Sequence, residues 1–289
     1  MPGPSLDVLV VGSANLDVVV RAERHPAPGE TLLGRELAEH PGGKGLNQAV
    51  AAARSGARTG FVGALGDDAA GRLLGKVLES DAIDASHVKV VAEPTGRALI
   101  VVADDGENTI VVAPGANATV VCPTPLPPAA VVLAQLELPL DTVMATLRAA
   151  RAAGSTTVLN PAPAAELADE LLALVDIVVP NEHEAELLGG PARLLAGGSR
   201  AVVVTRGGAG VDVHTATGVD HVPPHPVDPV DTTGAGDAFC GSLCARLAAG
   251  DDLAAAVKWA AVAGALATTV SGAVPGQPTA DAIRDALDS

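Results

Sequence analysis

The sequence predicts an α/β protein, with a doubly wound, mainly parallel sheet, helices on both faces, and a small β-sheet lid. Three observations lead to this prediction. Short apolar runs alternate with helix-forming segments along most of the chain. The first run, residues 6–11, is apolar on both faces, as in a central strand of a parallel sheet. Segments 16–40 and 96–113 break the alternation with β-prone pieces and turn residues, so we expect the lid there.

The elements of the main body follow one another as strand and helix within one expected domain, residues 1–289. Strands are expected at 6–11, 59–62, 131–135, 156–159, 177–179 and 201–205. Helices are expected at 45–55, 68–79, 140–153, 164–173, 182–188, 235–249, 253–269 and 279–287. We expect right-handed crossovers between parallel strands, and ligands in such sheets bind at the carboxyl ends of the strands.

The lid segments contain their own strand signals. Residues 98–102 and 109–112 predict a hairpin around a polar turn, and residues 17–20 and 31–33 are β-prone. These pieces are apolar in runs, so a thin sheet built from them needs a cover on both faces. Substrate or the main body can cover one face, and a second subunit the other. We therefore expect a lid that also forms a homodimer.

Composition limits the classes of function. Hydrophobic residues make up 48% of the 289 residues, which is enough for a sizeable core. The net charge of −16 and an aromatic content of 1% oppose binding to nucleic acids or anionic membranes. Three cysteines without a Cys-x-x-Cys pair suggest a reducing compartment. The N-terminus has no basic region typical of a signal peptide, and the Ala-rich stretch 253–274 predicts a buried helix. We expect a cytoplasmic protein.

The strongest local motif is Asp-Thr-Thr-Gly-Ala-Gly-Asp at 231–237, directly before a helix. Gly234 and Gly236 let the backbone approach a ligand, and the helix N-terminus favours an anion such as phosphate. Asp237 is placed to accept a proton from a hydroxyl beside that phosphate. The motif taken alone also fits an ordinary helix start with an acidic first turn. Walker A and dinucleotide fingerprints fail, because Gly45 follows Lys44 and Phe239 replaces the required glycine.

A second group of polar residues suits a polyhydroxy ligand. Asn15 and Asp17 follow the first strand and alternate along an extended chain, so they point the same way. An amide beside a carboxylate can bind adjacent hydroxyls. The Gly-rich stretch before the first helix adds donors from Lys44 and Asn47. Each of these residues alone also fits a loop or a helix cap.

Later motifs keep two interpretations each. Asn181 and Glu184, three apart, suit phosphate or magnesium-bound water, and they also form a capping-box pattern. The turn Thr205-Arg-Gly-Gly-Ala-Gly210 fits a nucleotide clamp or a tight hairpin. The histidines at 221 and 225, separated by two prolines, do not suggest a metal site.

Taken in order along the chain, these motifs resemble the ribokinase family of sugar kinases, the phosphofructokinase-B-like (PfkB) carbohydrate kinases. The resemblance runs nearly end to end and includes Gly12-Ser-x-Asn15-x-Asp17, Gly42-Gly-Lys-Gly-x-Asn47, Gly115-Ala-Asn117, Gln135-Leu-Glu137, Asn160-Pro-Ala-Pro, Pro180-Asn-Glu-x-Glu184, Thr205-x-Gly207 and Asp231-Thr-x-x-Ala-Gly-Asp237. It implies a ribokinase-like fold and ATP-dependent phosphorylation of D-ribose at its primary 5-hydroxyl. Alternatives are a kinase for a nucleoside, deoxyribose or a fructose derivative, or a non-catalytic sugar-binding protein on the same fold.

The resemblance also implies roles for residues at the matching positions. Asp237 would be the general base, and the backbone N–H groups of Gly234, Ala235 and Gly236 would hold the transferred phosphoryl group. The residues implied to hold the sugar are Asn15, Asp17, Gly43, Lys44, Gly45, Asn47, Glu137 and Asp237. Those implied to line the ATP site are Asn181, Thr205, Gly207, Gly208, Gly210, Gly236 and Ala261.

Metal ions enter only through the same resemblance. Mg²⁺ would accompany ATP, with Glu184 acting through water, and a monovalent cation (K⁺) would bind beside the anion site. The positions implied for K⁺, mostly through carbonyl oxygens, are Asp231, Thr233, Ala267, Val270, Gly272 and Gly276. The family usually has a full helix between residues 188 and 201, where this chain is short, so we expect one flank of the sheet to be less covered. Ala261 replaces a frequent polar residue near adenine, and Gly276 replaces a frequent serine.

Overall fold

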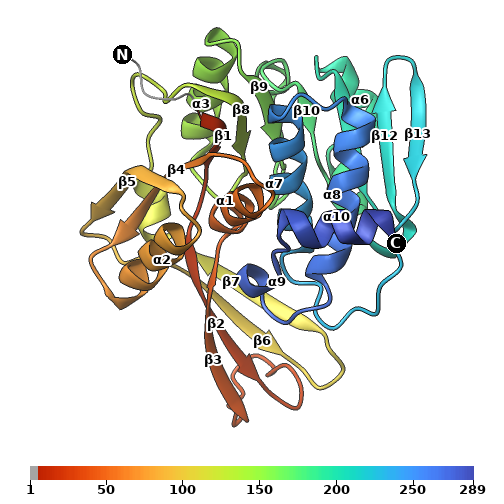
Figure 1. Cartoon of the computed structure of the whole chain (residues 1–289). Coiled ribbons are helices and arrows are strands. Elements are labelled where there is room, and N and C mark those ends of the chain that lie inside the picture. The colour runs from red at the N-terminus through yellow and green to blue at the C-terminus, as the bar shows by residue number, and fades with distance from the viewer. Residues whose placement is uncertain (1–5) are drawn as a thin grey trace.

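A nine-stranded sheet runs through the larger part of the molecule, and a separate four-stranded sheet projects from it (Figure 1). The computed structural model describes residues 6–289, so the expectation for the first five residues lies outside the described part. The strands of the large sheet are β1 (Leu6–Val11), β4 (Thr59–Gly66), β5 (Asp84–Val91), β8 (Ala129–Ala134), β9 (Thr156–Leu159), β10 (Ile177–Val178), β11 (Ala201–Thr205), β12 (Val211–Thr215) and β13 (Gly218–Val222).

The order β13-β12-β11-β10-β9-β8-β1-β4-β5 confirms the doubly wound, mainly parallel sheet. Only the pairs β11–β12 and β12–β13 are antiparallel. The β11–β12 hairpin agrees with one of the two interpretations of the turn at 205–210, whereas β13 and β5 were not predicted. β1 pairs in parallel with β4 and β8, one on each side, which makes it the central strand that its unbroken apolar run predicts.

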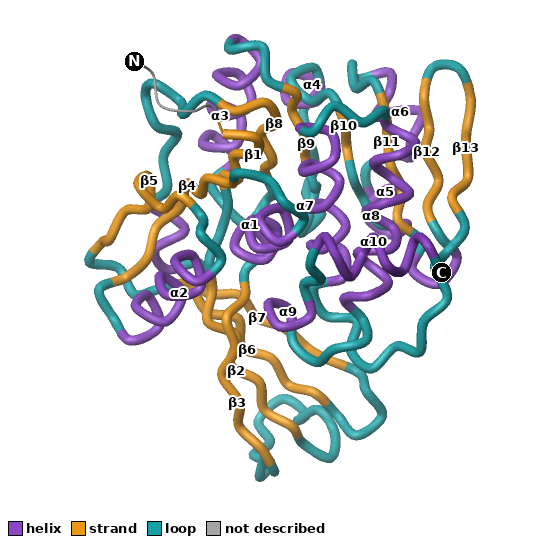
Figure 2. The backbone as a smooth tube through the Cα atoms, viewed as in Figure 1, coloured by secondary structure: helices purple, strands orange, loops and turns teal. Residues whose placement is uncertain are grey.

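Ten helices are described: α1 (Lys44–Arg54), α2 (Ala69–Ser80), α3 (Leu140–Ala152), α4 (Asp169–Leu172), α5 (Glu182–Leu187), α6 (Gly190–Ala196), α7 (Ala235–Ala248), α8 (Leu253–Ala267), α9 (Ala273–Gly276) and α10 (Ala280–Asp288). They cover both faces of the sheet (Figure 2). Val8 and Val10 of β1 join one core cluster with residues of α1, α2, α7 and α8. Leu9 and Val11 join the other with residues of α3 to α6. The alternation of side chains along β1 therefore separates the two cores. Within residues 6–289, no helix is long and apolar enough to cross a membrane.

Three expectations about local elements are wrong. The helix expected at 164–173 is only α4, because Leu167 is buried in a non-helical turn whose carbonyl accepts from Arg193. The segment between 188 and 201 forms α6, which begins after the left-handed Gly189 and buries Leu194, so that flank is covered. Residues 31–33 form no strand, and Leu33 is 92% exposed. Tertiary packing decided the first two cases against local propensity, whereas residues 31–33 have no strand partner.

The predicted lid is the four-stranded sheet, in the order β3-β2-β6-β7, formed by β2 (Asn15–Arg21), β3 (Glu36–Gly42), β6 (Gly96–Val102) and β7 (Asn108–Ala113). The β6–β7 hairpin confirms the prediction for residues 96–113. β3 supplies the fourth strand by pairing antiparallel with β2, which sets Gly42 opposite Asn15. The lid exposes large apolar side chains, among them Leu99 (50%) and Val111 (61%).

Candidate active site

The first turn of α7 borders a pocket of about 220 Å³ at the carboxyl-end edge of the large sheet. Its N-cap, Gly234, adopts the left-handed conformation (φ 79°), and a Cβ there would lie 2.9 Å from Ala273 Cα. Gly236 is exposed, with nothing within 4 Å of where its Cβ would be. Ala235 turns toward the neighbouring larger pocket, and its N–H donates to Thr232 O at 3.3 Å. The turn therefore presents backbone to the pocket without side chains in the way.

Asp237 is the third residue of α7 and is only 8% exposed. Its Oδ2 accepts from Asn47 Nδ2 at 2.9 Å, and its Oδ1 accepts from Gln48 Nε2 at 2.8 Å. Both donors come from α1, which packs closely on α7 because Gly241 has no side chain to hold the helices apart. Asn47 was predicted as a site residue, whereas Gln48 was not, since a glutamine inside an amphipathic helix usually faces solvent.

The polar residues expected to bind hydroxyls come together beside this carboxylate. Asn15 is buried, and its Oδ1 accepts from Asn117 Nδ2 at 2.8 Å. The pKa of the Asp17 carboxyl is raised to about 7, first by burial and then by the negative charges of Glu137 and Asp237, against the opposing charge of Lys44. This electrostatic coupling joins residues from β2, α1, α7 and the segment after β8 in one site.

Glu137 is fixed by two donors. Its Oε2 accepts from Ser13 Oγ at 2.5 Å and from the backbone N–H of Lys44 at 3.2 Å. The pKa of the Lys44 ammonium is raised: burial alone would lower it, but the charges of Asp237, Glu137 and Glu184 outweigh burial. Lys44 lines the same pocket as Asn181 and Glu184.

Gly43 and Gly45, which were expected to bind the sugar, have a packing role in the structure. A Cβ at Gly45 would lie 2.5 Å from Gly12 C and Ser13 N, so α1 touches the end of β1 there. Gly43 adopts φ 90°, and a Cβ on it would lie 2.7 Å from the backbone nitrogen of Asn15. Both glycines let α1 begin directly against the strand ends that carry the polar residues.

Asn181 and Glu184 form the capping box that was the alternative interpretation of their spacing. Asn181 Oδ1 accepts from the Glu184 backbone N–H at 2.7 Å, and Glu184 Oε2 accepts from the Asn181 N–H at 2.9 Å. Both residues also line the smaller pocket, opposite Gly234 and Gly236. The cap therefore orients the two side chains at the pocket wall without removing them from it.

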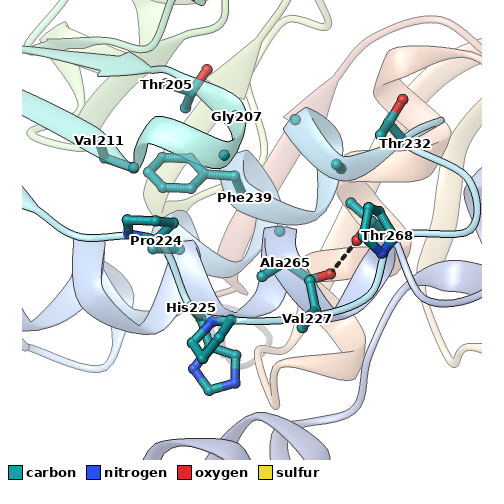
Figure 3. Close-up of a pocket in the computed structure, with 18 residues that line it drawn as sticks. Thr205, Gly207, Val211, Pro224, His225, Val227, Thr232, Phe239, Ala265 and Thr268 are labelled. Carbon is teal, nitrogen blue, oxygen red and sulfur yellow. Dashed lines mark hydrogen bonds between the residues drawn. The ribbon is translucent and has the colours of Figure 1, made fainter.

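Figure 3 shows a second, larger pocket of about 490 Å³. It adjoins the first pocket and shares Thr205 and Gly236 with it. Five expected nucleotide residues besides Gly236 line it: Thr205, Gly207, Gly208, Gly210 and Ala261. The turn at 205–210 thus closes the β11–β12 hairpin and also forms a pocket wall. Sequence reasoning missed Phe239 and the loop from Pro224 to Pro229, although Phe239 lies only two residues after Asp237. This apolar lining suits a flat aromatic base.

The residues expected at the cation site converge on the loop before α9. Asp231 Oδ1 accepts from the Thr233 N–H at 2.9 Å and Oδ2 from the Gly272 N–H at 2.8 Å. Burial alone would raise the pKa of Asp231, but hydrogen bonds from Thr233, Gly272 and Ser271 lower it. A Cβ at Gly276 would lie 2.7 Å from Ala267 O and 3.3 Å from Val270 O. Among residues 6–289 there is no cluster of three or more His, Cys, Asp or Glu side chains able to hold a metal.

Comparisons with known proteins agree with this geometry. The sequence matches the pfkB family carbohydrate kinase over residues 5–280. It is 39% identical over 290 residues to a ribokinase of Staphylococcus aureus, covering 92% of this chain and 94% of the relative. It is also 39% identical to a bifunctional ribokinase/ribose-5-phosphate isomerase A of Fructilactobacillus sanfranciscensis, covering 97% of this chain and 56% of that longer protein.

A solved structure of Arabidopsis thaliana ribokinase complexed with ribose and ATP superposes with a TM-score of 0.91. It is 31% identical and covers 99% of both chains.

Proposed function

The chain belongs to the pfkB family of carbohydrate kinases, and from that premise we propose that it transfers the γ-phosphoryl group of ATP to the primary 5-hydroxyl of D-ribose. The observation that carries the proposal is the place of Asp237. It borders the smaller pocket, which joins the apolar nucleotide pocket, and it is electrostatically coupled to Asp17. The names of the relatives and the ribose and ATP in the Arabidopsis thaliana complex support ribose as the sugar.

In the proposed reaction, Asp237 accepts the proton of the sugar hydroxyl as that oxygen attacks the γ-phosphorus. The new oxygen–phosphorus bond forms as the bond to the ADP oxygen breaks, giving ribose 5-phosphate and ADP. The N–H groups at Gly234 and Gly236 would donate to the transferred phosphoryl oxygens, where preorganised donors are most effective. Lys44, whose pKa is raised by the charges of Asp237, Glu137 and Glu184 against the effect of burial, would add a positive charge at the same place.

The sugar would be held by the polar residues beside Asp237. The carboxylates of Asp17 and Glu137 would accept from its hydroxyls, and the amides of Asn15 and Asn47 can both donate and accept. A nucleoside, deoxyribose or a fructose derivative stays the alternative substrate.

The residues present fit the two metal ions that the resemblance implies. Glu184 and Asn181 lie at the pocket wall near Lys44, which suits Mg²⁺ held mainly by phosphates and water. Mg²⁺ would neutralise charge on the phosphates of ATP. Carbonyl oxygens of Ala267 and Val270 surround a space that a Cβ at Gly276 would fill, a donor set that suits K⁺. Asp231 would supply the negative charge there.

The lid supports a homodimer. Four apolar side chains of this thin sheet are each at least half exposed: Leu37, Leu99, Ile110 and Val111. An exposed apolar surface of this kind favours association with a second copy of the chain, which would bury it. Sedimentation velocity of wild type and Val111→Asp tests it. A dimer that dissociates in the variant supports the proposal, and a wild-type monomer at micromolar concentration contradicts it.

ADP release coupled to an indicator enzyme tests the activity. Ribose, deoxyribose, fructose and several nucleosides are compared with ATP, Mg²⁺ and K⁺, and K⁺ is then exchanged for a bulky organic cation. Turnover of ribose far above the other substrates supports the proposal. Turnover of another substrate would support the same phosphoryl transfer and assign the substrate to that class. If folded protein turns over none of the substrates, the non-catalytic alternative is favoured.

A further inference from the structure

Gln48 lies directly behind Asp237 and lines neither pocket of the site. It is fully buried within α1, yet its Nε2 donates to Asp237 Oδ1 at 2.8 Å. A side chain without solvent exposure cannot touch a sugar or a nucleotide in the pocket. Any influence of Gln48 on the reaction must therefore pass through the side chains that it holds, and of these Asp237 and Asn160 line the smaller pocket.

Gln48 is itself held by residues that follow two neighbouring strands of the large sheet. Its Nε2 also donates to Asn160 Oδ1 at 3.0 Å, and Asn160 Nδ2 donates to Val179 O at 2.9 Å. Its Oε1 accepts from Gln135 Nε2 at 2.5 Å. Gln135 follows β8 and Asn160 follows β9, so the amide of Gln48 connects the base to the edge of the sheet.

The direction of these hydrogen bonds follows from the carboxylate. An ionised carboxylate only accepts, so Gln48 must turn its Nε2 toward Asp237 and its Oε1 toward Gln135. Gln135 must then donate, which leaves its own Oε1 buried with no hydrogen-bond partner in the described part of the chain. Gln135 Oε1 lies against Gly12, where any side chain would overlap it. An unpaired buried acceptor is destabilising, and the fold keeps one here where the arrangement serves Asp237.

We infer that Gln48 is a positioning residue for Asp237, oriented by Gln135 and Asn160. Together with Asn47 it fixes the carboxylate in one rotamer and keeps both oxygens as acceptors toward the sugar hydroxyl. The inference rests on the proposed function, since it assigns Asp237 the role of base. It adds to that function a buried hydrogen-bond chain that no substrate contact would reveal.

Gln48→Met tests the inference, because methionine has a similar length and volume without the amide. We expect kcat to fall roughly 10- to 100-fold, the cost of a misplaced catalytic group, while Kd for sugar and for ATP stays within about twofold. A kcat within about twofold of wild type would overturn the inference. A rise in the Kd for sugar as large as the fall in kcat would also overturn it.

Ser242→Ala is the matched control. Ser242 is fully buried on α7, and its Oγ shares a hydrogen bond of 2.8 Å with Ser55 Oγ, adjacent to the end of α1. The variant removes a buried hydrogen bond between the same two helices but touches nothing at Asp237. Its kcat should match wild type. A loss as large as that of Gln48→Met would assign the effect to helix packing and contradict a positioning role.

A double-mutant cycle tests whether Gln48 affects kcat through Asp237. In an Asp237→Asn background, Gln48→Met should lower the residual kcat by less than about twofold, because the group that it positions is already gone. Losses that multiply would show that Gln48 acts elsewhere and would overturn the inference.

The contact can also be tested without any substrate, which separates this inference from the proposed function. The side-chain amide signals of Gln48 in a ¹⁵N-correlated NMR spectrum are assigned by their loss in Gln48→Met. They should shift in Asp237→Asn and stay in place in Ser242→Ala. Signals unmoved in Asp237→Asn would overturn the inference. If the wild-type protein does not phosphorylate ribose but the Gln48 signals shift in Asp237→Asn, the proposed substrate is refuted and the contact between Gln48 and Asp237 is still supported.

Discussion

Gly42 leaves the space that the Asp17 carboxylate occupies. A Cβ built on Gly42 would overlap both carboxylate oxygens of Asp17, and it would lie 2.6 Å from Oδ1. The two residues lie on the paired strands β2 and β3 at the base of the lid. The glycine therefore sets the position of a carboxylate proposed to bind the sugar.

Gly42→Ala should displace Asp17 and raise KM for the sugar about tenfold, with kcat little changed, because a lost substrate contact affects binding of ground and transition states alike. Steady-state kinetics with varied sugar measures this. Gly75→Ala in α2 is the control, since a Cβ there meets nothing within 4 Å. Equal KM in Gly42→Ala and wild type would remove Asp17 from the sugar site.

The raised pKa of Asp17 predicts a pH dependence of stability. Its pKa rises from 3.8 to about 7 in the folded protein, so between these values the native state binds more protons than the unfolded chain. The contribution of Asp17 to the free energy of unfolding therefore falls as the pH rises from about 4 to 7. Asp17→Asn should gain thermal stability relative to wild type at pH 8, and this gain should shrink toward pH 5. A difference in Tm that does not vary with pH would contradict the shift.

Asp237→Asn should separate catalysis from sugar binding. The amide occupies the same space but cannot accept a proton, so kcat should fall by about 10²- to 10⁴-fold. The Kd for the sugar, measured by calorimetry without ATP, should stay within a few-fold of wild type. Near-normal turnover would exclude Asp237 as the base.

The N-cap of α7 should tolerate alanine at one glycine and not at the other. Gly234→Ala forces a left-handed φ on a residue whose Cβ would lie 2.9 Å from Ala273 Cα, and should cost about 1–2 kcal/mol of stability. At Gly236 a Cβ meets nothing within 4 Å, so Gly236→Ala should unfold at the same urea concentration as wild type. Equal midpoints for the two variants would contradict the geometry of this turn.

The sequence by itself determined the architecture and the order of the site motifs. Alternating apolar runs, glycine stops and the polar turn of the lid are local signals, and they predicted the parallel sheet, the β6–β7 hairpin and Asp237 at the start of α7. These features depend on residues near one another in the chain. Asn15 and Asp17 were found from their position after the first strand, where parallel topology gathers ligands, whereas Lys44 and Asn47 were found in the Gly-rich stretch before the first helix. The rest of the sugar set came from the family resemblance.

Only the tertiary structure decided what depends on distant segments. β3, α6 and the shortened α4 were set by partners across the fold, which local propensity does not encode. The pKa of Asp17 is raised by burial and by charges 120 and 220 positions away along the chain. In the sequence, Gln48 has no feature that distinguishes it from other polar residues of a helix. It is a buried donor to Asp237 only because Gly241 lets α1 and α7 pack closely. Hydrogen-bond direction and electrostatic coupling are properties of atoms brought together by folding.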